Sequence, residues 1–394
     1  MKLLKKQFCI LIACISIVAG CISDFKVNIS DSSEGVLVVE GYILENSDSK
    51  FSFSKSFSMS ESGPPAGYDE VQVNLYVVGD NGYRSEAASY LGKGVHQIKV
   101  GKLDDHVSYG IEFEYNGDTY HSNLTKPVYT PPIDSISWSQ PREYGDVSIQ
   151  ISTHNDAEKT SYFTWKYTED WEIRVSYQVE VIYNEAKREF VQYEYAPRYY
   201  CWRKNEGHDI LIGSTETFTE NRLINHKLYN RDSSTDRFSV LYSTSILQRG
   251  LSKAGYEYYL DLQKSNEEMG GLFSSQPSGI EGNITCVNDP SKKIIGFIEV
   301  NNNVEEEQLY INSRDILRKP PSLDCPTLGP DSVAGIMERL EIGMYDLLNL
   351  GYHPILSNME RPSDSWEWTY TTCLNCVTIG GTKNKPDFWP NDHK

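Results

Sequence analysis

The sequence predicts a mainly β protein, with an N-terminal immunoglobulin-like β-sandwich followed by a larger antiparallel β-rich domain that carries one or two helices. Three observations favour this class. Short apolar–polar alternations recur along the chain, Asn-Gly turn signals follow two of them, and tyrosine is abundant, at 27 of 394 residues. Alternation with a period of two is typical of half-buried strands, and tyrosine suits strands with one packed face and one wet face.

The first twenty residues have the pattern of a lipoprotein signal peptide. Three lysines precede an apolar run from Phe8 to Val18, which is shorter than the roughly 20 residues that a membrane-spanning helix needs. The run ends at Val18-Ala19-Gly20-Cys21, which resembles a bacterial lipobox. We therefore expect cleavage before Cys21 and a membrane anchor on its thiol, with an ordinary secretory signal as the alternative. Residues 21–34 are polar and indicate a flexible tether.

The mature chain is predicted to be strongly acidic. The signal peptide contains three of the 37 basic residues, which leaves 34 basic against 55 acidic residues and a net charge of −21. Nucleic-acid binding depends on neutralisation of phosphates by Lys and Arg, and attraction to anionic lipid depends on a basic patch, so the charge argues against both partners. A solvated acidic surface explains this charge more simply than a cation site does.

Residues 35–130 are predicted to form the immunoglobulin-like domain. Asn81-Gly82 and Asn116-Gly117 are predicted as two-residue type I′ hairpin turns, because Asn and Gly tolerate the positive φ that both central positions require. Pro127 and Pro131-Pro132 mark the end of the domain. The expected strands include Val36–Tyr42, Val71–Val78 and Ile111–Tyr115.

The β-rich C-terminal domain is predicted over residues 133–394, with a helix at 252–269 that covers one face of its sheet. Ser252 is the expected N-cap, and Gly270 is the expected residue after the helix. The packed face is predicted to comprise Tyr256, Tyr259, Leu260 and Gln263. Residues 331–350 also have helical spacing, but two glycines interrupt them, so the sequence does not decide whether they form a helix.

A set of ordered motifs resembles one known family. The N-terminal motifs are the lipobox, Val38-Val39-Glu40-Gly41-Tyr42 and Pro131-Pro132-Ile133-Asp134-Ser135-Ile136. The later motifs are Cys201-Trp202, Gly270-Gly271-Leu272-Phe273, Gln276-Pro277-Ser278, Gly282-Asn283-Ile284 with Cys286, Cys373-x-x-Cys376, Gly380-Gly381-Thr382 and Lys385-Pro386-Asp387-Phe388-Trp389. In this order they resemble the Bacteroidota lipoproteins of the domain of unknown function 4249, over nearly the whole mature chain. The resemblance implies an outer-membrane lipoprotein, often encoded beside a TonB-dependent receptor, and it brings no assigned catalytic residue or ligand.

Five cysteines follow the one expected to be lipidated: Cys201, Cys286, Cys325, Cys373 and Cys376. Outside the cytoplasm the default is disulfide bonding, so we expect two disulfides and one spare thiol, with no pairing assigned. The Cys373-x-x-Cys376 motif leaves two alternatives open. A redox pair would need the start of a helix after a strand, and a zinc site would need further ligands at suitable spacing.

No catalytic or cofactor motif is present in the sequence. The eight histidines are scattered singly, and neither a nucleophile elbow nor a phosphate-binding loop occurs. The acidic runs at Glu267-Glu268 and Glu305-Glu306-Glu307 are interpreted as solvated surface. We therefore expect a non-enzymatic envelope lipoprotein that binds a ligand or assists TonB-dependent nutrient uptake.

Two further hypotheses are a structural or adhesive surface protein and an uncharacterised hydrolase. A concave cleft with converging aromatic side chains would favour binding, whereas a flat surface at a strand edge would favour adhesion. The sequence does not identify the ligand, the oligomeric state or the membrane face on which the protein lies.

Overall fold

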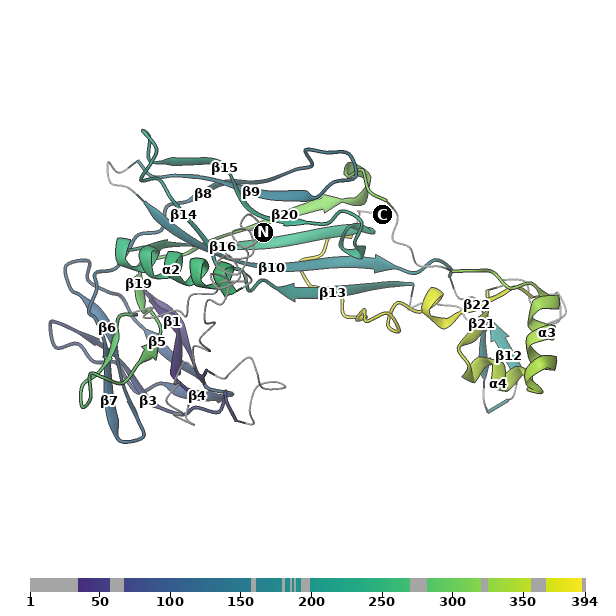
Figure 1. Ribbon diagram of the computed structural model, residues 1–394, viewed down its shortest axis with the longest axis horizontal. Coiled ribbons are helices and arrows are strands. Elements are labelled where there is room, and N and C mark those ends of the chain that lie inside the picture. The colour runs from purple at the N-terminus through teal and green to yellow at the C-terminus, as the bar shows by residue number, and fades with distance from the viewer. Residues whose placement is uncertain are drawn as a thin grey trace, which may run out of the picture.

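The computed structural model has three parts arranged along its longest axis (Figure 1). It describes residues 35–56, 67–156, 161–178, 181–184, 186–187, 189–192, 199–269, 282–319, 325–355 and 366–391. The predicted signal peptide at 1–20, lipidated Cys21, the tether at 21–34 and the motifs between Gly270 and Ser278 lie outside the described residues. Within these ranges strands predominate and most pair antiparallel, so the prediction of a mainly β protein is confirmed.

The N-terminal part is a sandwich of two open sheets. One sheet has the order β18-β1-β2-β5-β4, with β19 also paired to β1, and the other has the order β17-β7-β6-β3. Phe53 and Phe113 meet edge to face between the sheets, with ring centroids 5.0 Å apart, and both are fully buried. The strands from the first part of the chain are β1 Leu37–Leu44, β2 Ser47–Lys55, β3 Asn74–Gly79, β4 Ser89–Gly92, β5 Val95–Val100, β6 Tyr109–Tyr115 and β7 Asp118–Ser122.

Three strands from much later in the chain complete this sandwich, which the predicted domain of residues 35–130 did not include. They are β17 Ile284–Cys286, β18 Ile294–Ile295 and β19 Glu299–Asn301. β18 and β19 pair parallel with β1, and β17 pairs antiparallel with β7. Parallel neighbours cannot be joined by a tight turn, so no local pattern in the sequence indicates this pairing.

The two predicted hairpin turns differ in the structure. Asn116 and Gly117 both have positive φ, at 51° and 83°, as a type I′ turn between β6 and β7 requires. At the other position only Gly82 has positive φ, at 85°. The type I′ prediction for Asn81-Gly82 is therefore wrong. The turn is longer than two residues, because it closes through a hydrogen bond of 2.9 Å from Gly79 N to Tyr83 O, and the chain then returns along β3 through an isolated bridge between Val78 and Arg84.

The central part packs two antiparallel sheets face to face. One has the order β15-β9-β8, and the other has the order β13-β10-β16-β20, with β14 also paired to β10. Their buried side chains form one core, in which Ile149, Trp165 and Tyr242 are almost completely covered. The strands are β8 Ile133–Ser139, β9 Val147–His154, β10 Tyr162–Arg174, β13 Tyr200–Glu206, β14 Leu211–Ser214, β15 Arg222–Arg231, β16 Leu241–Leu251 and β20 Glu305–Asn312.

A small lobe forms the third part, at the end of the molecule farthest from the N-terminal sandwich (Figure 1). Its core comprises Val333, Leu347, Trp366 and Trp368. The undecided stretch at 331–350 contains two short helices rather than one, because Glu341 takes a left-handed conformation and ends the first. The elements are β11 Val181–Asn184, β12 Glu189–Gln192, α3 Pro330–Leu340, α4 Met344–Asn349, β21 Tyr352–Pro354 and β22 Trp368–Tyr370.

The predicted long helix is present as α2, Lys253–Met269, and Ser252 caps it by accepting a hydrogen bond from Gly255 N at 3.1 Å. The predicted packing face is only partly right, because Tyr256 packs on the central sheet but the prediction omits Tyr258. The most buried aromatic side chain is Tyr258, which is 7% exposed and contacts the Phe297 ring at 5.4 Å, whereas Leu260 is only half-buried.

The position of α2 between two parts of the molecule explains this difference. On one side Tyr256 packs on Tyr162 of the central sheet, with ring centroids 5.1 Å apart. On the other side Tyr258 packs on Phe297, from the segment that joins the N-terminal sandwich. A helix held on two sides buries a different set of positions from the single stripe that a pattern analysis assumes.

We expect Tyr258→Ala to lower the free energy of unfolding by about 3 kcal/mol, because it removes a large buried ring. The exposed neighbour provides a matched control, since Glu257→Ala should change it by less than about 0.5 kcal/mol. Urea unfolding followed by tryptophan fluorescence measures both. If Leu260→Ala lowers the free energy of unfolding more than Tyr258→Ala does, the packing face that the sequence predicted is the correct one.

Candidate functional site

An open cleft lies on the outer face of the central sheet, on the side away from the core. Its volume is about 520 Å³, within the range of about 300–1,000 Å³ that is common for small-molecule sites. Strands β10, β13, β16 and β20 provide the floor, and residues 382–388 of the C-terminal tail provide one wall.

Strand alternation places polar side chains along the floor. The odd-numbered residues of β10, from Phe163 to Ile173, belong to the core or to its buried polar network. Because side chains alternate along a strand, the even-numbered Thr168 and Asp170 point to the opposite face. The sheet register extends this row across three other strands. Lys204 on β13 is opposite Asp170, Ser245 on β16 is opposite Thr168, and Gln308 on β20 is opposite Ser245.

Asp170 is the unusual residue of the floor. It is 9% exposed, yet no group in the described part of the chain donates a hydrogen bond to its carboxylate. Burial raises the pKa of this carboxyl group, and the nearby Lys204 ammonium opposes the rise. Buried carboxylates are normally hydrogen-bonded or paired. An acceptor that faces a cleft without a donor is therefore a candidate ligand contact.

The remaining floor groups are held by short-range hydrogen bonds. Ser245 Oγ donates to Glu306 Oε1 at 2.5 Å, and Gln308 Nε2 donates to Ser243 Oγ at 2.9 Å. These bonds fix the orientation of Ser245 and Gln308. Within the described ranges the Gln308 side-chain carbonyl has no donor of its own, so it adds a second acceptor to the floor.

The C-terminal tail forms the wall because several contacts hold it on the sheet. Trp202 and Thr382 exchange two backbone hydrogen bonds of 2.8 Å. Trp389 is 3% exposed, and its indole N–H donates to Glu172 Oε2 at 3.2 Å. The next residue toward the cleft, Phe388, stays 48% exposed. The tail therefore buries one aromatic ring as an anchor and presents another at the rim.

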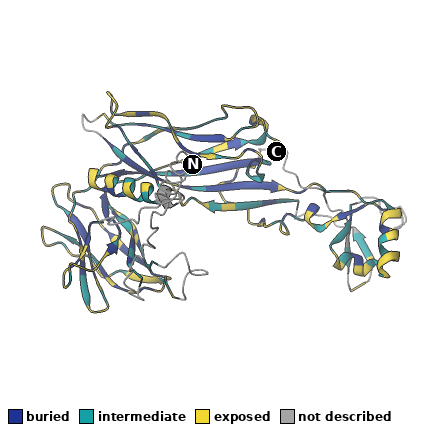
Figure 2. Cartoon of the chain, viewed as in Figure 1, coloured by how far each residue is buried: buried dark blue, intermediate teal, exposed yellow. Residues whose placement is uncertain are grey.

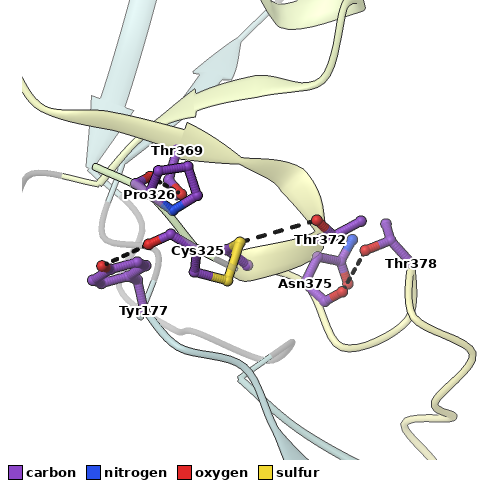
Figure 3. The surroundings of a disulfide bond; sticks show 8 residues. Tyr177, Cys325, Pro326, Thr369, Thr372, Asn375 and Thr378 are labelled. Atoms are coloured by element: carbon purple, nitrogen blue, oxygen red, sulfur yellow. Dashed lines mark hydrogen bonds between the residues drawn. A yellow bond between two sulfur atoms is a disulfide. The ribbon is translucent and has the colours of Figure 1, made fainter. Parts of the chain in front are cut away.

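Two disulfides fasten the tail to the rest of the chain. Cys201 of β13 pairs with Cys376, and Cys325 pairs with Cys373. Around the second bond, Tyr177 donates from its hydroxyl to the Cys325 carbonyl oxygen at 3.2 Å (Figure 3). The same figure shows Thr369 donating to the carbonyl oxygen of Pro326, at 2.8 Å.

The structure therefore contains the two disulfides that the sequence predicts, with Cys286 as the free and buried thiol. The two cysteines of the Cys-x-x-Cys motif bond to partners elsewhere and not to each other, which does not fit a redox pair. No three His, Cys, Asp or Glu side chains within the described ranges lie close enough together to hold a metal ion.

A buried charge network supports the floor from the core side. Glu169 is fully buried and accepts hydrogen bonds from Arg231 Nε at 2.7 Å and from the Tyr242 hydroxyl at 2.7 Å. Burial opposes its ionisation, but these two donors keep the pKa of Glu169 below its usual value. Arg231 lies on β15 and Glu169 on β10, so the ion pair joins the two sheets.

A second buried carboxylate lies where the N-terminal sandwich meets α2. Glu299 is 1% exposed and accepts hydrogen bonds from both N and Oγ of Ser252, each at 3.0 Å. Burial raises the pKa of Glu299 to about 7, although the bonds from Ser252 and the charge of Arg249 oppose the rise. Both bonds go to Oε2, whereas the buried Oε1 has no hydrogen-bond partner among the described residues. Glu299 is not part of the cleft lining, so it belongs to the junction rather than to the site.

The sequence missed the residues of the cleft floor. Lys166, Thr168 and Asp170 are polar at alternate positions of β10, which is also the pattern of an ordinary solvated strand face. The sequence did single out Trp202, Thr382 and Phe388, as parts of motifs that the structure now brings to the cleft. Glu306, predicted as solvated surface, lines the cleft and is exposed.

Comparison with known proteins identifies one family. A family model described as "Domain of unknown function (DUF4249)" matches residues 22–307. This match contains the floor strands β10, β13 and β16 but not the tail wall, so it is shorter than the resemblance predicted from the motifs. No curated protein matches the chain. Within the described residues, no helix is both long enough and apolar enough to span a membrane.

Proposed function

Because the chain belongs to the DUF4249 family, whose description names no activity, we propose its function from the cleft: the protein is a non-catalytic cell-envelope lipoprotein that binds a small polar ligand on its central sheet. The observation that carries this proposal is the carboxylate of Asp170, which lines the cleft and lacks a donor among the described residues.

The cellular setting is part of the same proposal. Cys21 at the end of the lipobox would anchor the protein in the outer membrane, on either the periplasmic or the surface face. The family resemblance supports an accessory role in TonB-dependent nutrient uptake, with a receptor as the partner. In this setting the cleft would hold a nutrient close to the receptor that transports it.

The binding role is tested by filling the cleft. We expect Ser245→Trp to abolish the rise in melting temperature that wild-type protein shows with at least one member of a library of amino acids, short peptides and oligosaccharides. A matched control is Ser135→Trp, which changes an exposed strand serine outside the cleft. No stabilising compound for wild type, or an equal rise in Ser245→Trp, would contradict the proposal.

The anchor is tested by Cys21→Ala. We expect this variant to leave the membrane fraction and to incorporate no radiolabelled palmitate, because each buried methylene of an acyl chain contributes about 0.8 kcal/mol to membrane binding. Wild-type protein extracted from the membrane in detergent should carry the label and co-purify with a TonB-dependent receptor that mass spectrometry identifies. A Cys21→Ala protein that stays membrane-bound would contradict the lipoprotein assignment, and a wild-type preparation without a receptor would contradict the accessory role.

A further inference from the structure

The charges of the cleft disfavour an anionic ligand. Both of its cations lie beside protein carboxylates. Arg203 forms an ion pair with Asp236, although its Nε is buried without a hydrogen-bond partner among the described residues. Lys204 Nζ lies 3.8 Å from Glu206 Oε1, and Lys204 is also opposite Asp170. An anion entering the cleft would also approach the carboxylates of its lining. These are Asp170, Glu306 and Asp387. Like charges repel more strongly where water is partly excluded, so carboxylate and phosphate groups are poor candidates.

A cationic ligand is also disfavoured at the floor. Lys204 is opposite Asp170 across the β10–β13 pair, so the positive charge nearest to this carboxylate belongs to the protein. An incoming ammonium group would have to approach Asp170 beside that lysine. What Asp170 lacks is therefore a hydrogen-bond donor that brings no net charge, such as a hydroxyl group.

The other polar groups of the floor suit a ligand with several hydroxyls. Thr168 and Ser245 present hydroxyl groups on neighbouring strands, and Gln308 presents an amide. A hydroxyl both donates and accepts, so one kind of ligand group can satisfy a carboxylate, an amide and an ammonium in turn. A row of such groups across four strands matches a chain or ring that carries hydroxyls on successive atoms.

Aromatic side chains at the rim of the cleft provide the apolar surface that such a ligand also needs. Phe388 is 48% exposed beside the cleft, and Trp202 also lines it. A pyranose ring has an apolar face of C–H groups, which can pack on an aromatic face while its hydroxyls reach polar groups elsewhere. A peptide fits less well, because extended peptides add to the edge of a sheet, whereas β10 and β16 are interior strands of the floor.

We propose that the cleft is a carbohydrate-binding site, which takes a neutral sugar whose hydroxyls donate to Asp170 and whose ring packs on Phe388. This inference rests on the proposed function, because it names the class of ligand for the same cleft. It adds the requirement that binding depends on an acceptor at position 170 and on an aromatic ring at position 388.

The test is isothermal titration calorimetry on the full-length lipoprotein, in a detergent without a sugar headgroup. The probes are neutral hexaoses of glucose, mannose, galactose and xylose, an oligogalacturonate as the acidic sugar, and a set of tripeptides. We expect a neutral oligosaccharide to bind, and both Asp170→Asn and Phe388→Ala to weaken that binding about tenfold or more. The matched control is Phe218→Ala, which removes a 57% exposed ring outside the cleft lining and should leave the affinity within about twofold.

The other outcomes separate the two proposals. Tripeptides that bind and are weakened by the same two variants would leave the cleft as the ligand site but overturn the carbohydrate assignment. Binding of the acidic sugar alone would do the same. If no neutral sugar binds, or if neither variant weakens its binding, the carbohydrate proposal is wrong. The Ser245→Trp experiment then decides whether the cleft binds a ligand of another class.

Discussion

The Cys201–Cys376 disulfide is the constraint on which the candidate site depends. It joins β13 to a tail 175 residues later in the chain, and a crosslink over such a long loop removes much of the freedom of the unfolded chain. The bond lies beside the backbone pairing of Trp202 with Thr382. With the tail held there, Trp389 reaches Glu172 and Phe388 reaches the rim. The wall of the cleft is thus a consequence of covalent attachment as much as of packing.

A single strand serves the core and the cleft at once. Along β10 the odd positions face inward, where Glu169 is satisfied by Arg231 and Tyr242, and the even positions face outward, where Asp170 has no donor in the described part of the chain. Figure 2 shows β10 and β16 as long strands that are buried over most of their length. A buried carboxylate that accepts several hydrogen bonds from neighbouring strands makes the strand rigid. The floor of the cleft is therefore preorganised, and a ligand need not order it on binding.

The sequence predicts what depends on local spacing and misses what depends on distant pairing. The mainly β class, the turn at Asn116-Gly117 and the cap at Ser252 follow from short patterns, and all are present. The parallel pairing of β18 and β19 with β1 joins segments more than 250 residues apart, and no periodicity encodes it. The Tyr258 face of α2 was missed for the same reason, since its partner Phe297 comes from that distant segment.

The cleft could be predicted only in part. Cysteine number and an oxidising compartment predict two disulfides, but the partners follow from the fold. Motif residues such as Trp202 and Phe388 can be picked out along the chain, although nothing in the sequence shows that they meet. Asp170 could not be distinguished from a solvated aspartate, because its lack of a donor appears only when the tail covers the sheet.

The Cys201–Cys376 disulfide holds the tail in place as the wall of the cleft. Amide hydrogen exchange of Thr382 reports on this attachment, because the Thr382 N–H donates to the Trp202 carbonyl oxygen. In a Cys201→Ser/Cys376→Ser protein we expect Thr382 to exchange much faster than in wild type, while the amides of β10 stay protected. Equal protection of Thr382 in the two proteins would contradict the claim and would show that strand pairing alone holds the tail.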